Sequence, residues 1–191
     1  SVVNFQAITG DTYYIRVSGY NGASGNYVLN VGPTNDHCSD AMVVGEGSFP
    51  FDTTFADTDG PTMATCNFGG QYNQVNGDLW YSFTPTEDGT LDVTTCGSSF
   101  DTKLAIYQNP PCGPRSVYRA CSDDGCSLQS AINGLDVIGG VEYSIRVGGF
   151  QTARGAGVLN INFAPNCPAD YNNDGGVDGD DVIAFFGDWD A

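Results

Sequence analysis

The sequence predicts a mainly β protein, an antiparallel, jelly-roll-like β-sandwich that ends in an acidic loop and one short helix. The first observation is a series of short runs that are apolar, or that alternate apolar and polar residues, as strands do. These runs lie at 79–83, 90–95, 103–107, 143–147 and 158–163. The second observation is that helical periodicity is confined to the C-terminal end of the chain.

Turn-forming residues separate these runs. Gly, Pro, Asn and Asp favour turns because they adopt or fix backbone conformations that strands do not use. The predicted turns are Asn76-Gly77-Asp78, Glu87-Asp88-Gly89, Asn109-Pro110-Pro111, Asp124-Gly125 and Asn133-Gly134. Short strands at this spacing are typical of a two-sheet sandwich.

The chain repeats part of itself at an offset of 130 residues. Segment 5–31 aligns without a gap on segment 135–161, so that Arg16, for example, falls on Arg146. The matched positions include the strand-like Tyr-x-Ile-Arg-Val and the later Val-Leu-Asn. A fixed period of this kind indicates tandem structural units.

The repeat divides the chain into three predicted parts. Residues 1–32 are expected to be the terminal strands of a preceding sandwich repeat, residues 33–164 a complete sandwich, and residues 165–191 a loop with a helix. Segments 11–18 and 26–31 are predicted strands that need partners, because an isolated hairpin is marginal in water. Those partners are expected to be other copies of the chain or adjoining modules of the same long chain.

The charge of the chain excludes some classes of partner. Six Lys and Arg residues stand against 23 Asp and Glu residues, which gives a formal net charge of −17. Such a surface repels nucleic-acid phosphates and anionic membranes. No apolar run approaches the roughly 20 residues of a membrane helix.

The cysteines indicate disulfides and an extracellular or cell-surface protein. No CxxC pair is present and there is a single histidine, so a zinc site is poorly supported. We expect at least two disulfides within 38–126, with Cys112–Cys121 as the preferred pair and Cys167 outside the set. The seven cysteines are Cys38, Cys66, Cys96, Cys112, Cys121, Cys126 and Cys167.

The strongest chemical signal is an acidic loop at 170–181. Oxygen-bearing side chains recur at loop positions 1, 3, 5, 9 and 12, and a glycine stands at position 6, where a calcium loop turns sharply. Calcium takes six to eight hard oxygen ligands, so this spacing predicts one Ca²⁺. The predicted ligands are Asp170, Asn172, Asp174, Gly176 through its carbonyl, Asp178 and Asp181.

A helix is expected directly after this loop. Val182, Phe185, Phe186 and Trp189 follow the i, i+3, i+4, i+7 pattern of one apolar stripe. A stripe this hydrophobic is expected to pack on the sandwich, on a second helix or on a partner.

Several motifs of the 33–164 unit resemble a known type of domain. They include Asn35-Asp36-His37-Cys38, Leu79-Trp80-Tyr81-Ser82-Phe83, Cys121-Ser122-Asp123-Asp124-Gly125-Cys126 and Tyr143-Ser144-Ile145-Arg146-Val147. Together they resemble the pre-peptidase C-terminal type of domain over about 130 residues. The resemblance implies a non-catalytic β-sandwich of secreted bacterial proteins, linked to calcium, to secretion and to the binding of polymers or surfaces.

The C-terminal loop and helix resemble one half of a type I dockerin, which also carries Asp at the twelfth loop position. A full dockerin has two such halves, whereas one is present here. Gly179 and Asp180 differ from the hydroxyl and aliphatic residues of cohesin-binding dockerins. The resemblance therefore implies calcium binding rather than cohesin binding.

The sequence carries no motif for catalysis. It has no GxSxG elbow and no HExxH, and its Asp residues sit where turns already explain them. Asp101, Asp123 and Asp124 form a weaker candidate for a second calcium site, with turn capping as the favoured alternative. We expect a non-catalytic extracellular structural or adhesive module, the repeating subunit of a fibre or matrix assembled by strand complementation. The alternative is an accessory binding or tethering module of a larger secreted hydrolase, with polysaccharide or protein as the target.

Overall fold

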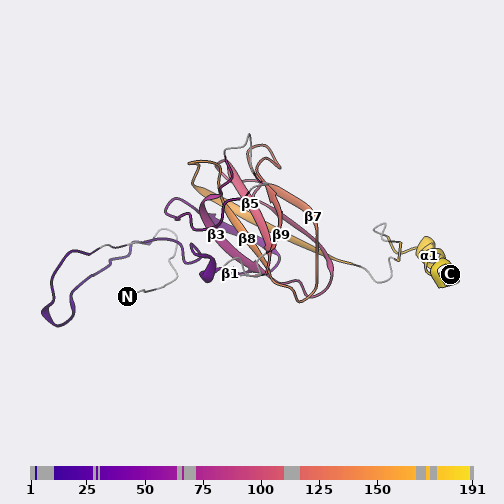
Figure 1. Cartoon of the computed structure of the whole chain (residues 1–191), viewed down its shortest axis with the longest axis horizontal. Helices are drawn as coiled ribbons and strands as arrows, with labels where there is room; N and C mark the ends of the chain where they lie inside the picture. Colours follow the sequence, from indigo (N-terminus) through magenta and orange to yellow (C-terminus); the bar gives the residue numbers. More distant parts are fainter. Residues whose placement is uncertain are drawn as a thin grey trace.

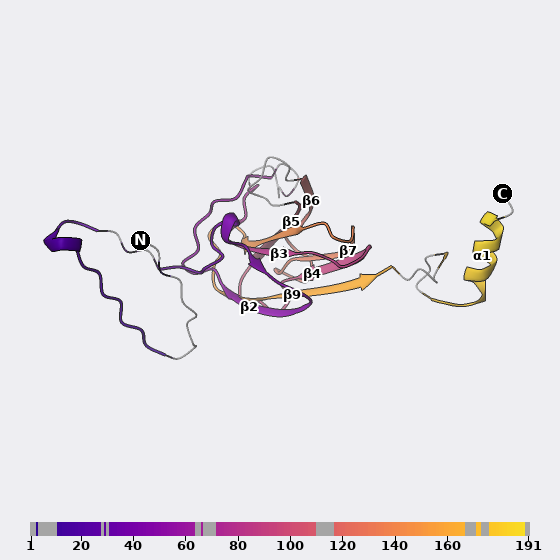
Figure 2. The same cartoon turned by 90° about the horizontal axis from the view of Figure 1, so that it is seen from below.

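Two β-sheets face each other in a computed structural model of the chain. The structure describes residues 3, 11–27, 29, 31–63, 66, 72–109, 117–166, 171–172 and 176–189. Figures 1 and 2 show the sheets as two layers, with the N-terminal segment and the C-terminal helix projecting from opposite ends of the sandwich. The predicted mainly β sandwich is therefore confirmed.

The first sheet has the strand order β1-β3-β8-β5-β6. Its strands are β1 (Met42–Val43), β3 (Asn76–Phe83), β5 (Thr102–Gln108), β6 (Val117–Ser122) and β8 (Tyr143–Gly149). All pairings are antiparallel except that of the short β1, which runs parallel to β3. Strand β8 lies in the middle of this sheet, and every residue of it is buried.

The second sheet has the order β2-β9-β4-β7 and is antiparallel throughout. Its strands are β2 (Gly47–Asp52), β4 (Gly89–Thr94), β7 (Ala131–Val137) and β9 (Ala156–Pro165). Strand β9 is central here, between β2 and β4. The last two strands of the sandwich, β8 and β9, are thus both central strands, one in each sheet.

The five strands predicted within residues 33–164 are all present, as β3, β4, β5, β8 and β9. Strands β1, β2, β6 and β7 lie outside the predicted runs; β2 contains Pro50, and β7 contains the turn-like pair Asn133-Gly134. The predicted turns at 76–78 and 133–134 are wrong. Both lie inside strands at register shifts, where glycine adopts a positive φ of 58° at Gly77 and 65° at Gly134.

The sandwich core lies between the sheets. Apolar side chains alternate inward along β4, where Leu91 and Val93 are fully buried, as expected for a sheet with one face in the core. Leu104, Ile145 and Leu159 from three further strands pack in the same cluster. A smaller cluster around Trp80 and Tyr107 lies apart from this core.

Disulfides join Cys66 to Cys121 and Cys96 to Cys126. The expectation of at least two disulfides within 38–126 is confirmed, and the preferred pair Cys112–Cys121 is wrong. Local sequence distance misled that choice, since the bonds follow spatial neighbours that lie 55 and 30 residues apart. The prediction for Cys167 lies outside the described residues.

The N-terminal segment forms no strand within its described residues. Residues 11–27 are exposed, and their regular structure is one short 3-10 turn at Tyr20–Gly22. The strands predicted at 11–18 and 26–31 are therefore not formed over the described residues, and their pairing with a partner stays a prediction. At the other end, helix α1 (Gly179–Trp189) is present as predicted. None of the described helices is both long and apolar enough to span a bilayer.

Candidate functional site

The candidate calcium loop is described in part. Asn172, Gly176, Asp178 and Asp181 belong to the described residues, whereas Asp170 and Asp174 lie outside them. Among the described residues no cluster of three metal-binding side chains occurs. Among the described carboxylates, Asp181 at position 12 has the most hydrogen bonds within the loop.

Asp181 is only 4 % exposed, although it lies in the first turn of an otherwise exposed helix. Its carboxylate accepts backbone N–H bonds from Asn172 at 3.2 Å and from Asp178 at 2.8 Å. The carboxylate at loop position 12 therefore faces the backbone of two other loop residues, Asn172 and Asp178. That arrangement fits a calcium loop, in which the twelfth residue ties the two ends together.

Helix α1 keeps much of its apolar stripe exposed. Val182, Phe185 and Phe186 are 54 %, 42 % and 58 % exposed. The ring of Tyr171 meets Phe185 edge-on with centroids 5.4 Å apart, so the loop contributes one contact to the helix. The predicted packing of the stripe on a larger surface remains a prediction.

The N-terminal segment has the same local turn as the β8–β9 connection. In residues 20–23 the last N–H donates to the first carbonyl at 3.0 Å, and in residues 150–153 the same bond is 2.9 Å long. The second residue of each turn is left-handed, with φ of 51° at Asn21 and 52° at Gln151. The repeat therefore extends from sequence to backbone geometry.

Each turn also requires a glycine at the residue before it, because the backbone there passes close to the last residue of the turn. A Cβ on Gly19 would lie 1.7 Å from the carbonyl oxygen of Ala23. A Cβ on Gly149 would lie 1.8 Å from that of Ala153. No side chain fits either place, so both copies need glycine there.

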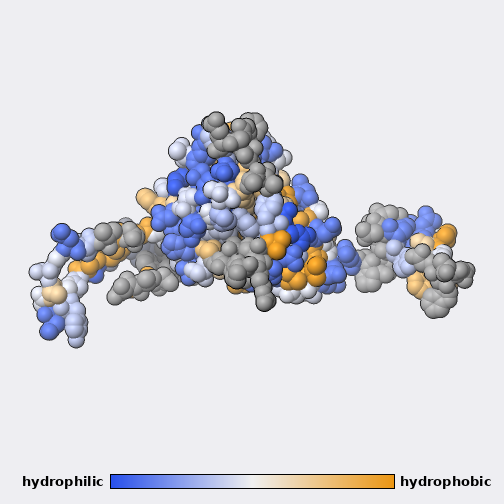
Figure 3. Space-filling model, in the orientation of Figure 1, coloured by the Kyte–Doolittle hydropathy of each residue, from blue (hydrophilic) through white to orange (hydrophobic). Residues whose placement is uncertain are grey.

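The two copies differ in burial. Ile15 is 53 % exposed whereas its counterpart Ile145 is fully buried, and Leu29 is 50 % exposed whereas Leu159 is fully buried. Figure 3 shows hydrophobic residues on the surface of the projecting N-terminal segment. Large exposed apolar patches mark interaction sites, so this segment is a candidate for one.

Arg146 anchors β8 by a buried ion pair that sequence reasoning missed. Its Nε lies 2.6 Å from Oδ2 of Asp78, and both side chains are fully buried. The guanidinium also donates to the carbonyls of Pro61 and Val75 and to Gln74. The available signal was a basic residue inside an otherwise apolar strand pattern, repeated at Arg16.

Burial raises the pKa of the Asp78 carboxyl, and the charge of Arg146 acts in the opposite direction. Backbone N–H groups of Asp59 and Gly60, each at 3.2 Å, also donate to this carboxylate. The pair therefore ties the loop around residues 57–63 to the first sheet.

The weaker acidic candidate contains a lysine. Asp123 lies 3.6 Å from Nζ of Lys103, which is fully buried and also donates to the carbonyls of Cys66 and Tyr72. Burial, and then the charge of Asp123, raises the pKa of Asp101. The ammonium pairs with Oδ2 of Asp123 only, and among the described residues Oδ1 of Asp101 and Oδ1 of Asp123 are buried without a hydrogen-bond partner.

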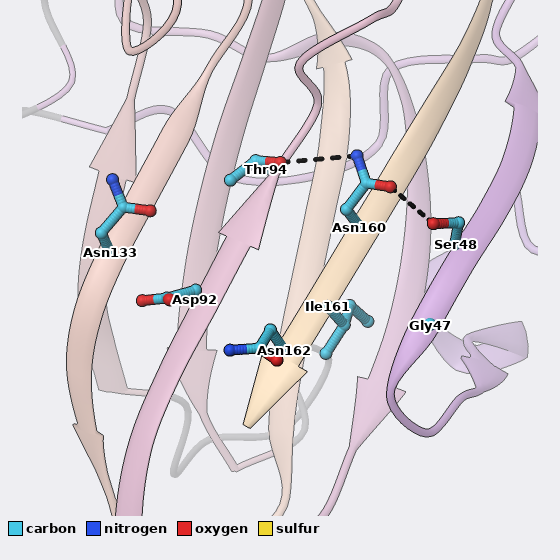
Figure 4. Close-up of a pocket in the computed structure, with 8 residues that line it drawn as sticks. All are labelled: Gly47, Ser48, Asp92, Thr94, Asn133, Asn160, Ile161 and Asn162. Atoms are coloured by element: carbon cyan, nitrogen blue, oxygen red, sulfur yellow. Dashed lines mark hydrogen bonds between the residues drawn. The ribbon is translucent and has the colours of Figure 1, made fainter. Parts of the chain in front are cut away.

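A groove of about 330 Å³ crosses the outer face of the second sheet. Figure 4 shows small polar side chains along it, with Asn160 in the middle. Asn160 accepts from Ser48 at 2.7 Å and donates to Thr94 at 3.5 Å, so these groups largely satisfy each other. None of the lining residues is aromatic, so the groove offers no ring for stacking.

His37 forms an exposed pair with Asp59, with 3.1 Å between Nδ1 and Oδ2. The hydrogen bond that His37 donates to the Asp59 carboxylate raises the pKa of His37. Asp59 also accepts from Nε1 of buried Trp80 at 3.0 Å, which holds its carboxylate in place. The pair connects the start of the sandwich to the loop of residues 57–63.

No family model and no curated protein matches this sequence. Among solved structures, the chain is similar to the pre-peptidase C-terminal domain of a collagenase from Bacillus anthracis. The identity is 11 %, the TM-score is 0.42, and the alignment covers 64 % of this chain and 94 % of that one. This is the type of domain that the sequence motifs resemble.

A second similar structure is CorA, a surface-associated copper-binding protein important in copper acquisition by Methylomicrobium album BG8. Its identity is 9 % and its TM-score 0.37, with 65 % of this chain and 98 % of that chain covered. Both TM-scores are below 0.5, and the strand order of this chain by itself defines the two-sheet sandwich. Neither structure bears on the dockerin-like loop.

Proposed function

We propose that this protein is a non-catalytic structural module of an extracellular assembly, and that residues 1–32 link it to a neighbouring sandwich. One observation carries the proposal: the sandwich of residues 33–164 already contains β8 and β9, each hydrogen-bonded on both sides. The second copy of these strands therefore has no place in this sandwich. Its apolar residues are exposed until another sheet pairs with them.

The disulfides support an oxidising, extracellular location. The acidic surface suits such an assembly, because it disfavours nucleic acid and binds cations.

Tryptic digestion tests the linking role. Arg16 is exposed and Arg146 is fully buried in the single chain, so trypsin is expected to cut after Arg16 well before Arg146. In the secreted assembly that contains the protein, Arg16 is expected to be protected. Arg119 is half-buried and serves as the control, since its rate of cleavage should be the same in both samples. Equal cleavage after Arg16 in both samples would contradict the linking role.

The C-terminal loop is proposed to bind one calcium ion through Asp170, Asn172, Asp174, the Gly176 carbonyl, Asp178 and Asp181. The buried carboxylate of Asp181 supports this assignment. Bound calcium would neutralise the repulsion among the loop carboxylates and hold helix α1 in a fixed orientation.

Terbium luminescence tests the calcium proposal. Tyr171 lies at the second loop position and can sensitise a bound Tb³⁺, which calcium should then displace and magnesium should displace poorly. Asp181→Ala is expected to abolish the signal, and Asp180→Ala, one residue away and not a proposed ligand, should keep it. Loss of the signal in both variants, or in neither, would contradict the ligand set.

A further inference from the structure

The proposed linking role leaves open which sandwich accepts the N-terminal segment. In this chain β8 lies between β3 and β5, and β9 lies between β2 and β4. A segment that replaces them must fill both central places at once. The residues that line those places decide which sandwich can take it.

Arg16 sets one requirement for the sandwich that accepts the N-terminal segment. Its counterpart Arg146 is fully buried against Asp78 and three further acceptors. A buried guanidinium without a carboxylate is strongly unfavourable. The accepting sandwich must therefore carry an acidic residue on the strand that corresponds to β3.

Three other residues of the N-terminal segment, Tyr14, Ser18 and Tyr27, do not fit the corresponding places in the sandwich of residues 33–164. Tyr14 corresponds to Ser144, which is fully buried and whose hydroxyl donates to the carbonyl of Asn109 at 3.4 Å, so a phenol ring there would have to displace the groups that cover it. Ser18 corresponds to Gly148, where a Cβ would lie 2.7 Å from the backbone oxygen of Asn76. Backbone of a central strand cannot move away cheaply.

Tyr27 presents the largest conflict. It corresponds to Gly157, where a Cβ alone would lie 2.4 Å from the ring of Phe51. Phe51 is buried and meets Phe100 edge-on, with centroids 6.2 Å apart, so its ring is held in place. A full tyrosine side chain there would displace Phe51, and with it the contact between β2 and β9.

We infer that residues 13–31 form the two central strands of an adjoining module, a sandwich with this topology but a different sequence. A copy of residues 33–164 is excluded as the sandwich that accepts them. The inference rests on the proposed linking role. It narrows the expected partners from copies of this chain to a distinct module. Exclusion by steric conflict at a few buried positions is a common basis of partner specificity.

Grafting tests this inference within the full chain. In the direct graft, residues 143–161 are replaced by the sequence of residues 13–31. In the relieved graft, the same segment carries Tyr14→Ser, Ser18→Gly and Tyr27→Gly. Both proteins retain the disulfides, which lie N-terminal to the graft. Near-UV circular dichroism and thermal unfolding report whether the sandwich forms.

The relieved graft is expected to unfold cooperatively within about 10 °C of the native chain, and the direct graft to show no cooperative transition. A third protein is the relieved graft in which the grafted Arg16 is replaced by Met. It should lose most of the stability that the relieved graft gains over the direct graft. If the direct graft is as stable as the relieved one, the exclusion of a second copy is wrong. If the relieved graft does not fold, the segment is not equivalent to β8 and β9. If Arg16→Met has no effect, the acidic partner is not required.

These outcomes are separate from the test of the linking role. Protection of Arg16 in the assembly depends on a partner being present, whereas folding of the grafts depends only on this chain. A relieved graft that folds, together with an unprotected Arg16, would refute the linking role and leave the structural equivalence intact.

Discussion

Replacing Arg146 by methionine removes the guanidinium that faces the buried carboxylate of Asp78 but keeps an unbranched apolar stem. The change breaks a 2.6 Å ion pair and leaves the carbonyls of Pro61 and Val75 without this donor. Removing one partner of a fully buried pair typically destabilises a protein by about 3–5 kcal/mol, because the remaining charge stays buried and unpaired. We expect a loss in this range at pH 7.

The loss should depend on pH in a definite direction. Burial already raises the pKa of Asp78 in the folded protein, and Arg146 counteracts that shift. Without Arg146 the folded pKa rises further. A carboxyl with a raised folded pKa lowers the free energy of unfolding as pH rises from its unfolded pKa, about 3.9, through its folded pKa. The variant should therefore lose more stability relative to the native chain at pH 7 than at pH 4.

Urea unfolding followed by near-UV circular dichroism, at both pH values and with the disulfides intact, measures these differences. Arg119→Met is the matched control. Arg119 is half-buried and donates to Gln108 and to the carbonyl of Asp136 without pairing with a carboxylate, so about 1 kcal/mol is expected. A loss below about 1 kcal/mol for Arg146→Met, or an equal loss at both pH values, would refute the account of the buried pair.

The double variant Asp78→Asn/Arg146→Met separates the pair from its surroundings. If the buried charge is what destabilises the single variant, the double variant should lose less than the sum of the two single variants. Additive losses would mean that Arg146 acts mainly through its other acceptors.

The other features give four further expectations. Asp174→Ala should lower the calcium affinity of the loop by roughly tenfold or more in a calorimetric titration, since it removes a charged ligand. The single histidine, His37, should titrate above its ordinary value of 6.5 by NMR, and Asp59→Asn should lower that pKa. Because the folded pKa is raised, the stabilisation from this exposed pair is present below pH 6.5 and is lost as pH rises through the folded pKa. Replacing Cys66 and Cys121 by serine opens a loop of 55 residues and should lower stability by about 4 kcal/mol in urea unfolding. The isolated chain should scatter light as a 20.1 kDa monomer, and concentration-dependent polymers would contradict the exclusion of self-complementation.

Local patterns in the sequence determined much of the fold. The five runs predicted as strands are strands, because alternation and turn residues act over a few neighbouring positions. The helix Gly179–Trp189 follows from its apolar stripe, whereas calcium binding by the loop before it stays a prediction from ligand spacing. The offset of 130 residues also indicated, from sequence alone, that segment 5–31 repeats the sequence of segment 135–161, which contains β8 and β9.

The tertiary structure alone decided which segments meet. Asp78 and Arg146 are 68 residues apart, and nothing in either local sequence indicates that β3 pairs with β8. The same holds for Cys66 with Cys121, and for the contact of Gly157 with Phe51 that excludes a tyrosine there. Such contacts depend on strand order, which is set by how the two apolar faces are best buried together and not by the propensity of any single segment.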